Sequence, residues 1–379
     1  MKPICTLLIH TPQELNHSSY IQTGFFELEK MGLVNVKVQL YIKKNRGTHT
    51  VDEYGNITKT SRPHPKTSFY TLVDNETNKK ITFATDLYDF AEHFSEAALN
   101  NCDFYFKRNF ESEPITIINQ NYKTKVLPLG LTFRVRSENN FSKNKFKWGI
   151  VISNYILNIK FDRLFFIRLK KTNNTVYNHL KKAEENRIIG RFEKYEKSFI
   201  GNSILFQTRC FLHEKDEDVK QIHQQRYNII KLLRQHFPDI FLGGFVPSKI
   251  ANSNYGDALT NVPTTPEEYL DVMKKAKIVI YTRGLANSPA WKMAEYLSQG
   301  KVIIAERMTT ELPVPLIEGK ELLYFHNDTE LIEKIKMVLE DELLAARLSK
   351  NARIYFETHV HPVQNTKRIL ELMLNKPLV

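Results

Sequence analysis

The stretch from Tyr281 to Glu306, YTRGLANSPAWKMAEYLSQGKVIIAE, contains the pattern from which the fold of this chain can be argued. It continues a short β-branched run, 276–281, that is typical of a buried parallel strand. Thr282 to Pro289 is rich in Gly, Asn, Ser and Pro, residues that end strands and begin helices. A short helix is predicted from Ala290 to Ser298, and a second strand from Val302. This order predicts a polar loop at the carboxyl edge of a parallel sheet, where α/β proteins bind phosphates and nucleotides.

Several side chains of this stretch resemble the donor-binding segment in the C-terminal domain of GT-B glycosyltransferases. The matching residues are Arg283-Gly284, Trp291-Lys292, Glu295 and Gly300-Lys301. The resemblance implies that the Glu binds the ribose of a nucleotide sugar, and that an Arg or Lys and the helix N-terminus bind its diphosphate. The fuller family pattern contains an earlier glutamate as well. That glutamate is absent from this chain, where Asn287 and Ser288 stand near its position. From the residues alone, an ordinary βαβ crossover with a solvated Glu295 stays open as the alternative.

The bulk composition limits the class of protein. A chain of 379 residues, 42% hydrophobic and 25% charged, is long enough and apolar enough for two globular domains. It lacks a run of about 18 apolar residues, so no transmembrane helix is expected, and the N-terminus does not match a signal peptide. The widely spaced Cys5, Cys102 and Cys210 predict buried thiols in a reducing cytoplasm.

The formal net charge of +12 calls for an explanation. General solubility, an anionic substrate and an anionic membrane surface all fit it. Nucleic acid is not expected, because the Lys and Arg residues are scattered and form no RNA-binding pattern. The segment 143–171 is apolar and flanked by lysines. It favours a helix pair packed on its own domain, with peripheral contact to a membrane interface as the alternative.

The first half of the chain begins as a β-α-β unit. Its strands are predicted at Cys5–Ile9 and Val34–Ile42, with a helix at Phe25–Met31 between them. Such a start suits a doubly wound sheet. The polar region 43–80 is predicted to be a hairpin-like insertion or a loop. Further strands end at Ala84, Arg108 and Gly130, and this half more weakly resembles the acceptor-side domain of bacterial GT-B enzymes.

We therefore predict an α/β fold with two Rossmann-like doubly wound domains that face a central cleft. Residues 1–199 would form the acceptor-binding domain, with insertions at 43–80 and 143–171. Residues 200–358 would form the domain that binds the nucleotide-sugar donor. The GT-B resemblance implies that the last segment, 359–379, is a helix that crosses back to the first domain.

The donor site needs positive charge for two phosphates. Arg209 ends a predicted strand, and Arg226 lies on the following helix. Together with Arg283-Gly284 and Lys292, these residues would bind a diphosphate without a metal, and Glu295 is the candidate for the ribose. The run Asp216-Glu217-Asp218 is interpreted as an acidic helix start, not as a metal-binding motif. No metal or further cofactor is predicted.

An inverting transferase also needs a general base near the acceptor hydroxyl, whereas a retaining one does not. Asp86 is the first candidate because it follows an apolar strand, and His10 and Asp89 are the others. The alternatives are that His10 is a structural capping residue and that Asp86 caps a helix.

These observations predict a cytoplasmic, metal-independent glycosyltransferase. It would transfer a sugar from a nucleotide-sugar donor to a glycan or lipid-linked saccharide, in surface polysaccharide or glycoconjugate synthesis. A nucleotide-sugar epimerase with the same layout is the first alternative, and it would need no acceptor. A non-enzymatic basic module that binds polyanions is the second, and its binding would be sensitive to salt.

Overall fold

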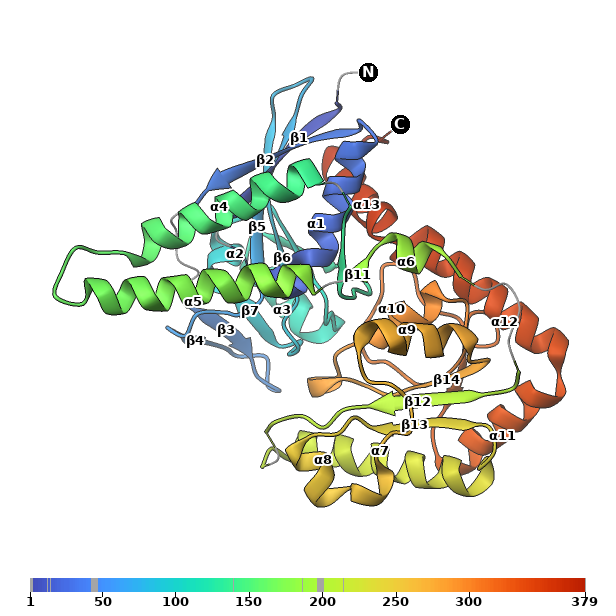
Figure 1. Ribbon diagram of the computed structural model, residues 1–379. Helices are drawn as coiled ribbons and strands as arrows, with labels where there is room; N and C mark the ends of the chain where they lie inside the picture. Colours follow the sequence, from blue (N-terminus) through green and yellow to red (C-terminus); the bar gives the residue numbers. More distant parts are fainter. Residues whose placement is uncertain are drawn as a thin grey trace. The chain divides into compact units, whose positions relative to one another are not determined.

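The computed structural model describes residues 3–11, 13, 15–41, 47–138, 140–185, 187–195, 201–213 and 215–378. The chain forms two compact units (Figure 1). The first contains Met1–Ile189, Glu311–Pro313 and Val360–Val379, and the second contains Gly190–Thr310 and Val314–His359. The chain thus passes from the first unit to the second and ends in the first.

The first unit is built on a six-stranded mixed sheet with the order β2-β1-β5-β6-β8-β9. Parallel pairs join β1 to β2, β6 to β8 and β8 to β9, whereas β5 runs antiparallel to both β1 and β6. The strand bounds are Cys5–Thr11 (β1), Val34–Leu40 (β2), Thr67–Asp74 (β5), Lys80–Asp86 (β6), Phe104–Lys107 (β8) and Lys125–Pro128 (β9). The predicted α/β fold is confirmed, with one antiparallel strand at the centre of the sheet.

The antiparallel strand β5 lies in the region 43–80, which was predicted to be a hairpin or a loop. The first part of this region does form a hairpin, β3 (Thr48–Val51) with β4 (Ile57–Thr60), and β3 also pairs with β7 (His93–Ser95). The interpretation of the second part was wrong. TSFYTLVD alternates in burial because every second side chain, from Ser68 to Asp74, enters the core.

The C-terminal helix α13 (Pro362–Leu374) packs against α1 (Leu15–Lys30) of the first unit. The helices meet at Gly24, where a Cβ atom would lie 2.3 Å from the Thr366 side chain. The Tyr20 hydroxyl donates a hydrogen bond to the Val360 carbonyl at 2.5 Å. The predicted return of the C-terminal helix to the first domain is therefore confirmed.

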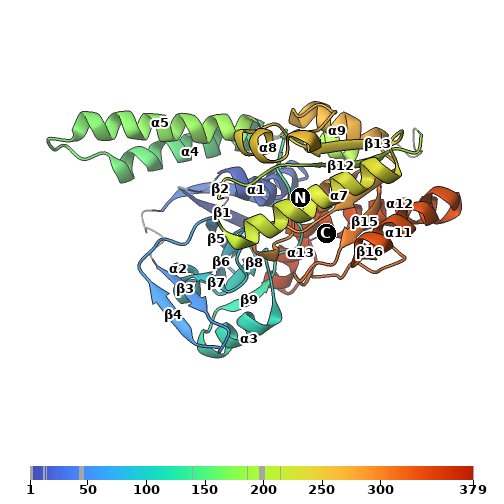
Figure 2. The same cartoon turned by 90° about the horizontal axis from the view of Figure 1, so that it is seen from below.

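The segment 143–171 forms most of a helical hairpin of α4 (Asn140–Asn158) and α5 (Phe165–Glu184), which run side by side (Figure 2). Gly149 brings α4 close to β2, since a Cβ atom there would lie 2.3 Å from the Val38 side chain. At the base of the hairpin, β10 (Val135–Arg136) pairs with β11 (Arg187–Ile188). The base is thus packed on its own unit, as expected. None of the helices in the described part of the chain has the length and hydropathy needed to cross a bilayer.

The second unit contains a five-stranded sheet with the order β13-β12-β14-β15-β16, and every pair in it is parallel. Its strands are Ile204–Thr208 (β12), Phe241–Phe245 (β13), Ile278–Tyr281 (β14), Val302–Glu306 (β15) and Leu323–Phe325 (β16). The first strand along the chain, β12, lies between the second and the third. The sheet therefore has a topological switch point between β12 and β14, and such points create a ligand-binding crevice at the carboxyl ends of the strands.

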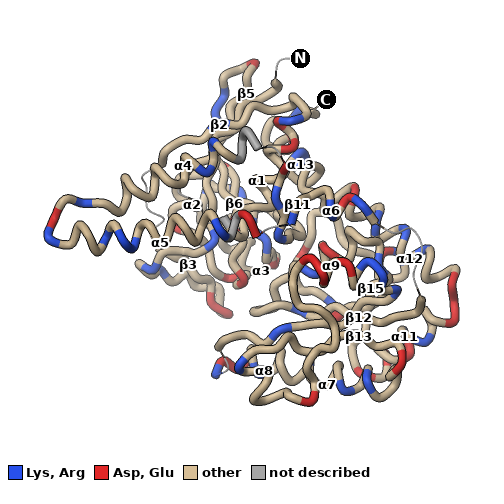
Figure 3. Tube along the Cα trace, in the orientation of Figure 1, with Lys and Arg blue, Asp and Glu red and all other residues tan. Residues whose placement is uncertain are grey.

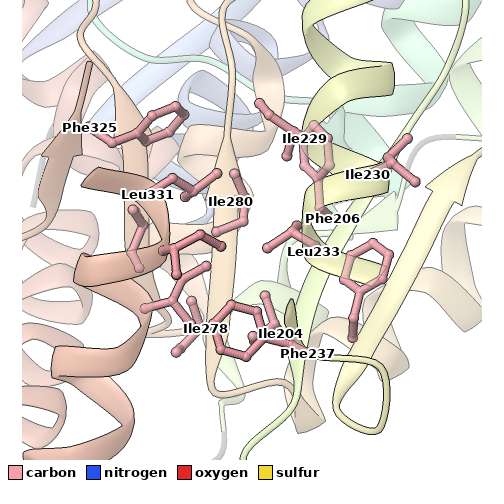
Figure 4. Packing of buried hydrophobic residues seen from close by; sticks show 14 of the residues in the cluster. Ile204, Phe206, Ile229, Ile230, Leu233, Phe237, Ile278, Ile280, Phe325 and Leu331 are labelled. Atoms are coloured by element: carbon pink, nitrogen blue, oxygen red, sulfur yellow. The ribbon is translucent and has the colours of Figure 1, made fainter. Parts of the chain in front are cut away.

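The core of the second unit explains why this sheet forms. Side chains of Ile204, Ile278 and Ile280 pack against α7 (Glu217–His236) and α11 (Asp328–Glu340), as Figure 4 shows. The remaining helices are α8 (Lys249–Asn254), α9 (Pro266–Lys275), α10 (Trp291–Ser298), α12 (Glu342–Tyr355) and the short α6 (Gly190–Glu193). Because both faces of the sheet are covered, its strands are continuous apolar runs.

Candidate active site

The residues predicted to bind the donor meet at the switch point of the second unit. Arg209 directly follows β12 and is exposed. The loop Thr282–Pro289 directly follows β14 and leads into α10. The order of the strands in the sheet reverses between β12 and β14. The fold therefore places these predicted residues at the carboxyl edge of the sheet, beside the switch point.

Arg226 of α7 joins the two loops. Its guanidinium group donates hydrogen bonds to the Arg209 carbonyl at 3.0 Å and to the Arg283 carbonyl at 3.1 Å. It also lies over the Phe211 ring, 5.1 Å from the centroid. Burial, and then the neighbouring Arg209 guanidinium, lower the pKa of Arg226 to about 10. We conclude that Arg226, predicted as a ligand of the diphosphate, holds the two loops in register.

Arg283 is fixed by two carboxylates that the sequence did not indicate. Its guanidinium pairs with Asp218 at 2.5 Å, and its backbone N–H donates to Glu306 at 2.9 Å. The second carboxylate oxygen of Asp218 accepts the Ala286 N–H at 2.9 Å. Asp218 therefore clamps the side chain and the backbone of the loop. Asp216, by contrast, is the N-cap of α7, as its place in an acidic helix start suggested.

The loop itself has an unusual backbone. Ala286 and Asn287 have φ values of +51° and +56°, in the left-handed region that disfavours side chains with a Cβ. Gly284 passes so close to Ser288 that a Cβ atom would lie 2.7 Å from its carbonyl oxygen. Strain of this kind persists where the surrounding contacts fix the backbone, and it is common at ligand-binding loops.

The loop delivers the N-terminus of α10 to the same edge. Tyr281 accepts the Ala290 N–H on its hydroxyl at 2.9 Å, and no side chain caps the helix at Ala290. A helix start carries a positive dipole that favours a bound anion.

Lys292 and Glu295 lie on α10 but differ from their expected environment. The Lys292 ammonium group donates to the Gln207 carbonyl in β12 and lies 4.7 Å from the centroid of the Tyr269 ring. The positive charge of Lys292 therefore lies beside the backbone at the end of β12. Glu295 is only 6% exposed, so the alternative of a solvated Glu295 is excluded.

In the first unit, Asp86, the first candidate for the general base, is completely buried at the end of β6. Its Oδ2 accepts hydrogen bonds from His64, Tyr105 and Lys107 at 3.1, 2.6 and 3.1 Å, and its Oδ1 accepts the Tyr88 N–H at 2.8 Å. Burial alone would raise the pKa of Asp86, but Lys107 and His64 lower it far below its usual range. This geometry makes Asp86 a structural carboxylate that neutralises buried Lys107, and it argues against a role as general base.

Asp89 lies near the surface, between two cations. Lys66 pairs with it at 2.5 Å, and Arg108 pairs with its other oxygen. Burial alone would raise the pKa of Asp89, but Arg108 and Lys66 lower it. Lys66 has a φ of +57°, another left-handed backbone. A carboxylate paired in this way is a weak base and a good anchor for the two cations.

His10, near the end of β1, is a neutral imidazole. Its Nε2 shares a hydrogen bond with the Thr71 hydroxyl at 3.0 Å, and its ring stacks on Tyr41 with 4.8 Å between centroids. Burial lowers the pKa of His10 to about 4. Its Nδ1 is buried and has no hydrogen-bond partner among the residues described. A neutral ring retains a lone pair that can accept a proton.

Comparison with known proteins bears on the second unit. Residues 226–371 match the family model described as "Glycosyl transferase-like". This segment contains Arg226, Arg283, Gly284, Lys292 and Glu295 but not Arg209. The resemblance predicted from the sequence is confirmed for this segment. No curated protein sequence matches the chain.

Among solved structures, the chain is similar at low identity to TarM and to a sucrose-phosphate synthase. TarM is matched with 12% identity and a TM-score of 0.35, over 86% of this chain and 67% of TarM. A mutant of S. aureus TarM, in complex with fondaparinux, α-GlcNAc-glycerol and UDP, is matched with 12% identity and a TM-score of 0.38, over 99% of each chain. Sucrose-phosphate synthase from Thermosynechococcus elongatus is matched with 11% identity and a TM-score of 0.35, over 72% of this chain and 73% of the synthase. The fold assignment rests on the strand order and not on these values.

Proposed function

We propose that the protein transfers a sugar from a nucleotide-sugar donor to a glycan or lipid-linked saccharide, in the synthesis of a surface polysaccharide or glycoconjugate. The observation that supports this most directly is the meeting of Arg209, Arg283 and the uncapped start of α10 at the switch point of a parallel sheet. The match of residues 226–371 to glycosyl transferase-like proteins covers most of the same unit and part of α13 in the first unit.

The proposed chemistry assigns each group a task. Arg209, Arg283 and the N-terminus of α10 stabilise the charge that develops on the diphosphate as the glycosidic bond breaks. Arg226 and Asp218 position the loops by the hydrogen bonds described above. Lys292 adds positive charge at the end of β12, and Glu295 accepts hydrogen bonds from the ribose hydroxyls.

The ribose role of Glu295 gives the central test. Glu295→Gln is expected to weaken nucleoside diphosphate binding by roughly 1.5–3 kcal/mol, because hydrogen bonds to a charged group are lost. Calorimetry with the nucleotide selected in a thermal-shift screen measures this. Glu333→Gln, the same change at an exposed position of α11, is the control. Equal affinity in Glu295→Gln and wild type, with equal melting temperatures, would remove Glu295 from the site.

We also propose that the reaction needs no metal ion. The cations named above supply the charge that a divalent ion would otherwise provide. Turnover is therefore expected to be the same in EDTA as in buffer with Mg²⁺ or Mn²⁺. Loss of turnover on chelation, restored by either ion, contradicts this and would point to the acidic start of α7.

An assay with and without acceptor separates the proposed transferase from its alternatives. A transferase consumes the donor fastest when an acceptor glycan is present. An epimerase would convert the donor equally well alone, and a polyanion-binding module would bind no nucleoside diphosphate.

We infer a cytoplasmic location for the enzyme, in peripheral contact with an anionic membrane. The described cysteines, Cys5, Cys102 and Cys210, are free thiols, which suits a reducing compartment. A lipid-linked acceptor would be presented at such a surface.

A further inference from the structure

Exposed apolar side chains are concentrated on the hairpin of α4 and α5. Among the described residues, eight of the eighteen large hydrophobic side chains that are exposed belong to this hairpin. They are Trp148, Ile152, Ile156, Phe161, Leu164, Phe166, Ile167 and Tyr177. Phe161 is 93% exposed and Phe166 80%. Such a concentration of exposed apolar side chains on one hairpin indicates an interaction site, because isolated exposed residues are common but gathered ones are not.

The pattern along α4 separates a packed face from an open one. Ile150, Ser153 and Asn154 are buried, on the side where Gly149 approaches β2. Trp148, Ile152 and Ile156 follow each other at intervals of four residues and form a stripe on another side of the helix. The stripe leads to the loop of the hairpin, where Phe161 stacks on Phe165 with 5.2 Å between ring centroids. Figures 1 and 2 show that this end of the hairpin extends beyond the sheet of the first unit.

The same segment is strongly basic. Between residues 141 and 171 the sequence contains eight Lys or Arg residues and a single acidic residue, Asp162, which pairs with Arg168 at 2.8 Å. The described side chains of Lys160, Arg163, Lys170 and Lys171 are exposed around the aromatic tip. Figure 3 shows Lys and Arg residues, in blue, along both helices of the hairpin. More than half of the net charge of +12 therefore comes from about one twelfth of the chain.

We propose that the α4–α5 hairpin docks the protein on an anionic lipid bilayer. Phe161, Phe166 and the stripe from Trp148 would enter the boundary between headgroups and acyl chains, while the lysines and arginines contact lipid phosphates. Aromatic and aliphatic side chains beside cations match such a surface in both polarity and charge. The helices lack the length and hydropathy to cross the bilayer, so the hairpin lies on it.

A second copy of the chain fits this surface less well. A two-fold contact would bring two identical basic patches together, and like charges across an interface oppose association. The inference deepens the membrane contact proposed above and rests on that part of the proposed function, but it is independent of which donor the second unit binds.

Vesicle co-sedimentation tests the proposal. Wild type is expected to bind vesicles with equal parts of phosphatidylglycerol and phosphatidylcholine, and to bind pure phosphatidylcholine weakly. Phe161→Ser with Phe166→Ser, and separately Lys170→Glu with Lys171→Glu, are each expected to lower partitioning by about tenfold or more. The matched control, Ile317→Ser with Leu343→Ser, removes exposed apolar side chains from the second unit and should bind as wild type does.

Fluorescence locates the contact. Trp148 is one of two tryptophans in the chain, so a blue shift on adding anionic vesicles that is absent in Trp148→Phe assigns it to the hairpin. All variants are compared by melting temperature and by nucleoside diphosphate affinity, which should not change. If wild type binds no nucleoside diphosphate, the proposed donor site is wrong, but the vesicle experiment still decides whether the hairpin docks on the bilayer.

Two outcomes overturn the proposal. One is equal partitioning of wild type and the hairpin variants on anionic vesicles. The other is self-association of wild type without lipid that Phe161→Ser with Phe166→Ser abolishes, which would assign the surface to a second copy of this chain.

Discussion

Replacing Asp86 by Asn is expected to lower the free energy of unfolding by about 3–5 kcal/mol, because it leaves a buried ammonium group without its counter-charge. Lys107 is fully buried, and its other partners are the carbonyls of Phe90 and His93, at 3.0 and 2.7 Å. Neutral carbonyls satisfy the N–H donors but do not neutralise the charge. The loss should appear as a lower midpoint of urea unfolding with an unchanged slope.

The double variant Asp86→Leu with Lys107→Met is the informative companion, because it removes both charges. It should be more stable than Asp86→Asn if the uncompensated charge dominates. Asp89→Asn, at a partly exposed ion pair, should cost less than Asp86→Asn. A change below about 1 kcal/mol in Asp86→Asn would contradict the structural role, since that is the range of ordinary surface pairs.

The pH dependence of stability follows from the direction in which folding shifts the pKa of Asp86. The pKa of Asp86 is lower in the folded protein than in the unfolded chain, so its contribution is present above about pH 4 and is lost as the pH falls further. Wild type should therefore lose stability more steeply than Asp86→Asn below about pH 4. Parallel acid-unfolding curves for the two proteins would argue against this linkage.

Replacing His10 by Ala is expected to lower turnover by about 10²–10⁴-fold, the range for removal of a general base. We propose His10 for this role because its neutral ring can accept a proton, whereas Asp86 is buried and Asp89 is paired with two cations. Donor affinity should stay unchanged, since His10 lies in the first unit and the donor residues lie in the second.

The shape of the pH profile adds a second readout. Because the pKa of His10 is lowered to about 4, turnover should be flat near neutral pH and fall only as the pH approaches 4. His236→Ala, at an exposed position in α7, is the control, and Asp89→Asn tests the other candidate. Normal turnover in His10→Ala, or a product that retains the anomeric configuration of the donor, would show that His10 is not the base.

Much of the fold can be predicted from the sequence because strands and helices have local periodicities. The run ending at Tyr281, the loop rich in Gly, Asn, Ser and Pro, and the helix after it form β14, the loop and α10 nearly as expected. The strand β5 was missed because its residues are half polar. It became a central strand only because β1 and β6 provide hydrogen-bonding edges on both sides.

The candidate donor residues were found because they follow strands, and the carboxyl ends of parallel strands meet at one edge of the sheet. The role of each of these residues was harder to predict from the sequence. Asp218 was interpreted as a helix-start residue, since an acidic residue there complements the helix dipole whatever else it does. Its contact with Arg283 spans 65 positions in the sequence, and only the packing of α7 beside the loop creates it.

The sequence by itself determined the α/β class, the parallel sheet of the second unit and the edge of that sheet at which the candidate donor residues lie, because these depend on local periodicity and on the order of elements along the chain. Only the tertiary structure decided that Asp86 is a buried partner of Lys107, that Arg226 is a tether, and that the apolar tip of the α4–α5 hairpin is exposed. Burial and charge pairing depend on residues that are distant in the sequence, and a local pattern does not contain that information.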